Sequence, residues 1–216
     1  MAGAEGSVVR TLFVVGAIAV AAALLVQSSY EFSKGRIAAN ERARLVASLN
    51  SVLDPTLGDT DLNPVLINAH DELLGSPEPV DVFIMMAAER PVAAIFATLA
   101  PDGYNAEIQL LVGVSPDEQI TGVRAVRHRE TPGLGDAIDI DKSDWIRQFD
   151  GKSLANPMPP LWAVAKDEGA FDSLTGATVT PRAVVKAVKN TLVYFAAHRD
   201  ELFAAAAGAA ADGNDQ

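Results

Sequence analysis

Four short apolar runs decide the fold: VDVFIMMAA at residues 80–88, VAAIFATLA at 92–100, IQLLVGV at 108–114 and ITGVRAVRH at 120–128. Turn-forming residues separate the runs, as in PDG at residues 101–103. Short runs of this kind, rich in β-branched and aromatic residues and bounded by turns, are typical of strands joined by hairpins. The sequence therefore predicts an antiparallel sheet.

Two helices are predicted downstream of these strands. In SDWIRQF, Ser143 is the expected N-cap of a short helix that places Trp145 and Phe149 on one face. A longer helix is expected from Thr180, the predicted N-cap, with Pro181 at the first helical position. Its apolar stripe consists of Val184, Val185, Val188, Leu192 and Phe195. A helix packed on an antiparallel sheet gives an α+β fold.

The start of the chain predicts a single transmembrane helix. Residues 11–30 carry no charge, and as a helix at about 1.5 Å per residue they would measure roughly 30 Å, the thickness of the hydrocarbon layer. They follow a short tail at residues 1–10. A cleavable signal peptide is the alternative, because Arg10 precedes the run and Ser28 and Ser29 follow it. Basic residues after the run mildly favour a cytoplasmic domain, but that rule weakens before a long folded domain, so the orientation stays open.

Residues 31–78 are predicted to be a connection, partly helical and partly irregular. Apolar residues recur at helical spacing in residues 40–53, whereas residues 56–79 are rich in Asp, Pro, Gly and Asn. The last thirteen residues, 204–216, contain mostly Ala, Gly, Asp and Asn and predict a disordered tail.

Composition excludes several classes of function. Asp and Glu number 28 against 17 Lys and Arg, with no basic cluster, so nucleic acid is not an expected partner. The chain has no cysteine, which excludes thiolate nucleophiles and cysteine-bound clusters. The histidines, His70, His128 and His198, are too scattered to predict a metal site. Any redox chemistry therefore requires an imported cofactor.

The sharpest local signal is DSLTGAT at residues 172–178, a glycine-containing turn that runs straight into the long helix. Unpaired N–H groups and the helix dipole favour a phosphate at such a point. Glycine permits a φ that other residues resist, and threonine hydroxyls can donate, accept or be esterified. The candidate phosphate-binding residues are Thr175, Gly176, Ala177, Thr178 and Thr180. The alternative is an ordinary loop with a threonine cap.

A second candidate segment is ETPGLGD at residues 130–136. Its glycines and proline let the backbone lie close to a flat ring, and Leu134 could cover an apolar ring face. The alternative is a surface turn, and the segment lacks the third glycine of a dinucleotide fingerprint. The candidate ring-binding residues here are Glu130, Thr131, Pro132, Gly133, Leu134 and Gly135. Tyr104 is a further candidate, equally credible as a hairpin residue packed on the sheet.

DSLTGAT resembles the motif recognised by the bacterial flavin transferase, which uses FAD to attach FMN by a phosphoester bond to the final Thr or Ser. The resemblance implies covalent FMN on Thr178. It also implies that Asp172, at the leading acidic position, serves recognition by the transferase and has no later redox role.

The resemblance extends over most of the chain. Besides the amino-terminal span, it rests on GYNAEIQLLVGV at 103–114, HRETPGLGD at 128–136, Trp145, Phe149 and FDSLTGATVTPRAVVKAV at 171–188. Together these resemble the G subunit of the Rnf electron-transport complex. The C subunit of the sodium-translocating NADH:quinone reductase is similar in its flavin domain but usually longer, and is the second choice.

The resemblance implies an FMN-binding domain at residues 79–203, anchored in the bilayer of the bacterial inner membrane and facing the periplasm. In it the flavin relays electrons to other subunits, coupled to ion translocation, with no independent turnover. The alternative of another class is a membrane-anchored binding or assembly module without flavin. A hydrolase or transferase ranks last, because the sequence has no nucleophile elbow, phosphate loop or other catalytic constellation.

Overall fold

The computed structural model describes residues 16, 19, 27, 46–54, 62–87 and 90–213. The chain divides into two units, Met1–Ala47 and Ser48–Gln216, and the second contains the folded domain. The predicted amino-terminal tail and transmembrane helix, apart from the three isolated positions, lie outside the described residues. Among the residues described, no helix is both long and apolar enough to cross a bilayer.

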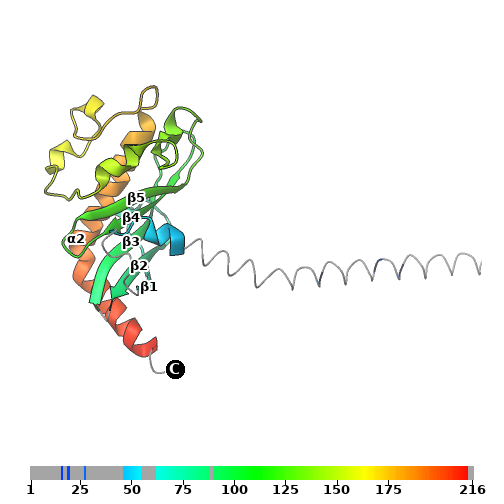
Figure 1. The fold of residues 1–216 in the computed structure, drawn as a ribbon, viewed down its shortest axis with the longest axis vertical. Coiled ribbons are helices and arrows are strands. Elements are labelled where there is room, and N and C mark those ends of the chain that lie inside the picture. The colour runs from blue at the N-terminus through cyan, green and yellow to red at the C-terminus, as the bar shows by residue number, and fades with distance from the viewer. Residues whose placement is uncertain are drawn as a thin grey trace, which may run out of the picture. The chain divides into compact units, whose positions relative to one another are not determined.

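The described part of the domain contains a five-stranded antiparallel sheet in which each strand pairs with the next along the chain (Figure 1). The strands are β1 (Asn63–Ala69), β2 (Val80–Ala87), β3 (Arg90–Ala100), β4 (Ile108–Val114) and β5 (Ile120–Arg127). The last four correspond to the four apolar runs, so the predicted antiparallel sheet is confirmed.

Strand β1 corrects the prediction of an irregular connection at residues 56–79. It adds to the sheet edge by pairing antiparallel with β2, and Val65 and Ile67 pack against the core while Leu66 between them is exposed. Side chains alternate between exposed positions and buried or partly buried ones in PVLINA, as in a half-buried strand. The turn-forming residues on both sides make this short pattern hard to recognise in the sequence. Pro64 is tolerated at the start of an edge strand, where its missing N–H removes no central hydrogen bond.

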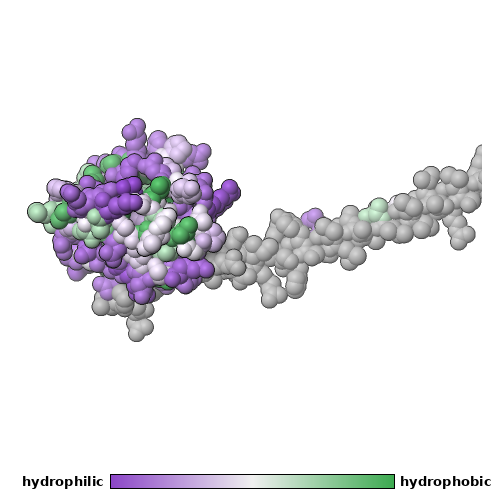
Figure 2. Space-filling view, turned by 90° about the horizontal axis from the view of Figure 1, so that it is seen from above, coloured by the Kyte–Doolittle hydropathy of each residue, from purple (hydrophilic) through white to green (hydrophobic). Residues whose placement is uncertain are grey.

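Both faces of the central strands β2, β3 and β4 are mostly buried, which explains why these strands read as nearly continuous apolar runs. Helix α2 (Val179–Gly213) packs on one face, as predicted. That face includes Ile84, Phe96, Leu110 and Val112. The opposite face includes Phe83, Ile95 and Leu111, which pack with Leu49, Val52 and Leu53. The molecular face in Figure 2 is accordingly mostly hydrophilic, with hydrophobic positions in small separate groups.

Two paired glycines leave room on the sheet for the backbone of the segment around Val52, which precedes β1. Gly113 of β4 pairs with Gly122 of β5, and a Cβ added at Gly113 would lie 2.4 Å from Val52 O. The Thr121 hydroxyl donates to the same carbonyl at 2.5 Å. Residues 46–50 are helical, which agrees with the helical spacing in residues 40–53 as far as the structure describes that segment.

Helix α2 differs from its prediction at both ends. It begins at Val179, one residue before the predicted N-cap, and continues to Gly213 through the segment expected to be disordered. Alanine has the highest intrinsic helix propensity, and Leu202 and Ala206 are buried against the core, so the alanine-rich sequence extends a helix that is already held.

Short 3₁₀ helices lie in the connections of the domain. η2 (Glu72–Leu74) lies between β1 and β2, and four more lie between β5 and α2: η3 (Gly135–Ile138), η4 (Asp144–Phe149), η5 (Pro159–Leu161) and η6 (Ala165–Asp167). The predicted short helix after Ser143 is confirmed as η4, with the Ser143 hydroxyl accepting from the Trp145 N–H at 3.1 Å. The rings of Trp145 and Phe149 meet edge to face, with centroids 5.6 Å apart.

We expect Gly113→Ala to destabilise the domain by about 1–3 kcal/mol, because the new methyl group overlaps the Val52 carbonyl and must displace backbone. Urea unfolding of the purified chain measures the change. Gly208→Ala is the control, since Gly208 lies in α2 with open space around it and should gain up to about 1 kcal/mol of helix propensity. Equal midpoints for Gly113→Ala and the parent would contradict the docking described here.

Candidate functional site

The loop that contains DSLTGAT starts from a rigid base. Trp145 Nε1 donates to the carbonyl of Asp172 at 2.8 Å, and the Asp172 N–H donates to Gln148 Oε1 at 2.7 Å. The residue before it, Phe171, is buried and its ring stacks on Phe149 with centroids 4.8 Å apart. Both backbone polar groups of Asp172 are thus held by η4, while its side chain remains exposed to solvent.

The loop then makes a tight turn whose backbone conformation favours glycine. The Ala177 N–H donates to the carbonyl of Leu174 at 3.2 Å, and Gly176 has φ +78°. A Cβ at position 176 would also lie 3.0 Å from Cδ2 of Leu134. Gly176 therefore serves both the backbone conformation and close contact with the second predicted loop.

Thr178 is the N-cap of α2. The helix begins at Val179, and the Arg182 N–H donates to the Thr178 carbonyl at 3.4 Å, the first hydrogen bond of the helical ladder. The prediction that Thr180 is the N-cap is therefore wrong, and Pro181 is the third helical residue. The structural consequence is that the half-buried Thr178 hydroxyl stands at the positive end of the helix.

The second loop is joined to α2 through a buried carboxyl group. Glu130 is 4% exposed, and its Oε2 accepts from the Thr180 hydroxyl while its Oε1 accepts from the Asn105 N–H at 3.2 Å. Gly135 packs closely against this pair, since a Cβ there would lie 2.8 Å from Thr180 Oγ1. Three segments distant in the sequence thus meet at Glu130.

The two loops and the start of α2 enclose a cavity of about 370 Å³, within the size range of small-molecule sites. It is lined by Tyr104, Glu130, Thr131, Leu134, Gly135, Gly176, Ala177, Thr178, Val179 and Thr180. Tyr104, Leu134 and Val179 are 66%, 43% and 42% exposed, so apolar surface faces solvent beside a buried carboxyl group.

The structure thus brings most of the sequence-predicted site residues together around one cavity. The exceptions are Thr175, Pro132 and Gly133, which are exposed and do not line it, and Asp172, which lies earlier on the loop. Sequence reasoning missed Val179, although its place directly after Thr178 was a usable signal.

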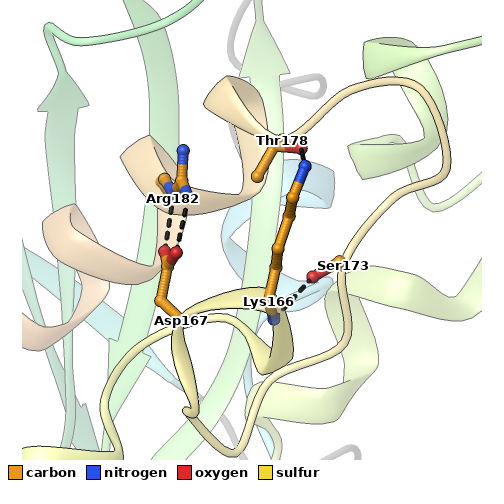
Figure 3. Close-up of polar contacts among 5 residues, drawn as sticks. All are labelled: Lys166, Asp167, Ser173, Thr178 and Arg182. Carbon is orange, nitrogen blue, oxygen red and sulfur yellow. Dashed lines mark hydrogen bonds and ion pairs between the residues drawn. The ribbon is translucent and has the colours of Figure 1, made fainter.

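Sequence reasoning also missed Lys166, which belongs to no motif. Its Nζ donates to Thr178 Oγ1 at 3.3 Å (Figure 3). Beside it, Asp167 forms a two-bond ion pair with Arg182 of α2. The hydrogen bond from Arg182 lowers the pKa of the Asp167 carboxyl group, so this group keeps its negative charge to a lower pH than an unpaired aspartate.

Comparison with known proteins identifies the class of domain that contains these loops. The family model described as an FMN-binding domain matches residues 103–193, which contain both loops and the first part of α2. These residues therefore form an FMN-binding domain.

Similarity over most of the chain identifies the family more narrowly. The chain is 41% identical to the G subunit of the ion-translocating oxidoreductase complex of Shewanella amazonensis, over 80% of this chain and 81% of the relative. It is 42% identical to the G subunit of the same name from Pseudomonas aeruginosa, over 94% and 95% of the two chains. It is 39% identical to the G subunit from Aliivibrio fischeri, over 89% of this chain and 92% of the relative. The chain belongs to this family of G subunits, which confirms the resemblance inferred from its motifs.

We expect Thr180→Val to destabilise the domain by about 1–3 kcal/mol, because it removes a donor and leaves a buried oxygen of Glu130 unsatisfied. The measurement is the urea midpoint of the purified chain. Thr175→Val is the matched control, since Thr175 is exposed and its replacement should change stability by no more than about 0.5 kcal/mol. Similar small effects for both variants would show that the Glu130 contact contributes little.

Proposed function

We propose that this chain carries FMN esterified through its phosphate to Thr178 Oγ1 and relays electrons within a membrane-bound, ion-translocating oxidoreductase complex. The match to the FMN-binding domain and the membership of the G-subunit family support the cofactor and the complex. The observation that carries the attachment site is the position of Thr178, whose hydroxyl lines the cavity at the N-terminus of α2.

The residues around the cavity fit a flavin mononucleotide. A phosphate on Thr178 Oγ1 would lie at the helix N-terminus, where the N–H groups of Val179 and Thr180 have no intrahelical partner. The exposed apolar surfaces of Tyr104 and Leu134 are suited to a flat aromatic ring. The flavin would supply one- or two-electron chemistry, and the chain would supply position, shelter and electrostatic environment.

Attachment needs a second protein and a flavin donor. The oxygen of Thr178 forms a bond to the flavin-side phosphorus of FAD, the P–O–P bond breaks, AMP leaves and the hydroxyl proton is released. We propose that a flavin transferase performs this step and recognises the exposed Asp172. The backbone of Asp172 is held by Trp145 and Gln148, so its side chain is presented from a fixed loop.

The proposed location explains the covalent bond. We place the domain in the periplasm, anchored in the bacterial inner membrane by residues 11–30 and in contact with other subunits of the complex. Binding by mass action fails where the free ligand is scarce, and a phosphoester bond removes dissociation altogether.

We predict that Thr178→Ala yields a folded chain without flavin, because the substitution removes the only atom proposed to accept the phosphorus. Intact mass and in-gel flavin fluorescence, after co-expression with a flavin transferase, measure attachment. Thr178→Ser keeps a hydroxyl and should be flavinylated. Flavin fluorescence that survives denaturation in Thr178→Ala would disprove the assignment.

A second prediction concerns recognition by the transferase. Asp172→Asn removes an exposed charge but leaves the backbone hydrogen bonds of that residue, so the unfolding midpoint should stay unchanged while the initial rate of flavinylation falls several-fold. A time course of intact mass with purified transferase and FAD measures the rate. Asp141→Asn, another exposed acid, is the control. An unchanged rate for Asp172→Asn would remove Asp172 from the recognition site.

A further inference from the structure

Lys166 reaches the proposed attachment site from a separate part of the chain. It belongs to η6, and its backbone N–H donates to Ser173 Oγ at 3.2 Å while its ammonium group donates to Thr178 Oγ1 at 3.3 Å. In Figure 3 the side chain extends from the η6 turn to the threonine at the start of α2. One residue therefore touches the loop at its beginning and at its end.

The other nearby cation is already neutralised. Arg182, in the first turn of α2, forms its two-bond pair with Asp167, and the pair fixes η6 against the helix. Lys166 forms no ion pair with any carboxylate within the described ranges. Its positive charge is thus held at a neutral hydroxyl, in a protein whose net charge is -11.

We propose that the Lys166 ammonium group is the counter-ion of the phosphodiester that joins FMN to Thr178. The inference rests on the proposed attachment. Esterification would place anionic phosphate oxygens next to Thr178 Oγ1, and an ammonium group at hydrogen-bond distance from that atom is within their reach. Lysine suits this task because its flexible stem lets a compact charge follow the oxygens as the ester forms.

This role would limit the motion of the attached flavin. A single phosphoester bond leaves several rotatable bonds between the protein and the ring. An ion pair from Lys166, added to the N–H groups at the start of α2, would fix the phosphate on two sides and direct the flexible chain of the cofactor into the cavity. Lys166 is therefore a binding and positioning residue, and the redox chemistry takes place elsewhere on the cofactor.

The experiment uses the flavinylated full-length chain, produced with a flavin transferase, as wild type, Lys166→Gln and Lys166→Arg. The control is Lys189→Gln, which removes one positive charge from α2 ten residues beyond its start. The ³¹P resonance of the phosphodiester reports its ion pairing, and fluorescence anisotropy reports flavin motion. We expect Lys166→Gln to shift the ³¹P resonance and to lower the fluorescence anisotropy of the flavin. Lys166→Arg should largely restore both, and Lys189→Gln should match wild type.

A salt titration of the wild-type protein gives a second test. At about 1 M salt the Debye length falls to roughly 3 Å, so the proposed ion pair should weaken. The ³¹P shift and the anisotropy of wild type should then move toward those of Lys166→Gln. If Lys166→Gln is poorly loaded with flavin, the salt titration of wild type tests the ion pair without the variant. The proposal would be overturned if wild type and Lys166→Gln had identical ³¹P shifts and anisotropies. It would also be overturned if salt left both signals of the wild-type protein unchanged. An unmodified mass for the wild-type chain would instead refute the attachment itself.

Discussion

The hydrogen bond from the Thr180 hydroxyl to the buried carboxyl group of Glu130 is the contact on which the cavity depends. It joins the first turn of α2 to the loop after β5, and the Asn105 N–H adds the β3–β4 connection through the other carboxyl oxygen. A buried carboxyl group must have its hydrogen bonds satisfied, so the three segments cannot separate without a large cost. The cavity is therefore largely formed before any cofactor arrives, which lowers the ordering cost of binding.

The sheet supplies the rigidity behind that contact. Helix α2 lies across one sheet face, and its first residue follows directly on Thr178, so the position of the hydroxyl is set by a long packed helix and not by a loop alone. On the far side the docked segment around Val52 covers the second face, which the Gly113–Gly122 pair permits. The aromatic group around Phe171 fixes the other end of the loop.

Sequence patterns predicted what depends on local order, and missed what depends on tertiary context. The four apolar runs, the Ser143 cap and the two glycine-containing loops carry their signals in adjacent residues. Strand β1 was missed because its neighbours are turn formers, and the end of α2 because an alanine-rich tail reads as disorder until buried residues such as Leu202 hold it. Lys166 has no sequence signal at all, since only folding brings η6 to Thr178.

The proposed covalent bond would retain the cofactor but would not orient it, so the two tasks would fall to different residues. One hydroxyl suffices to keep a cofactor, whereas electron transfer requires that the ring be held at a defined place relative to its partners. In the proposed arrangement, orientation would come from weak contacts with the helix N-terminus, with Lys166 and with the apolar rim formed by Tyr104, Leu134 and Val179. That rim is exposed beside Thr178, the proposed attachment point. The same surface that would shelter one side of a flavin thus leaves the other side accessible to a neighbouring subunit.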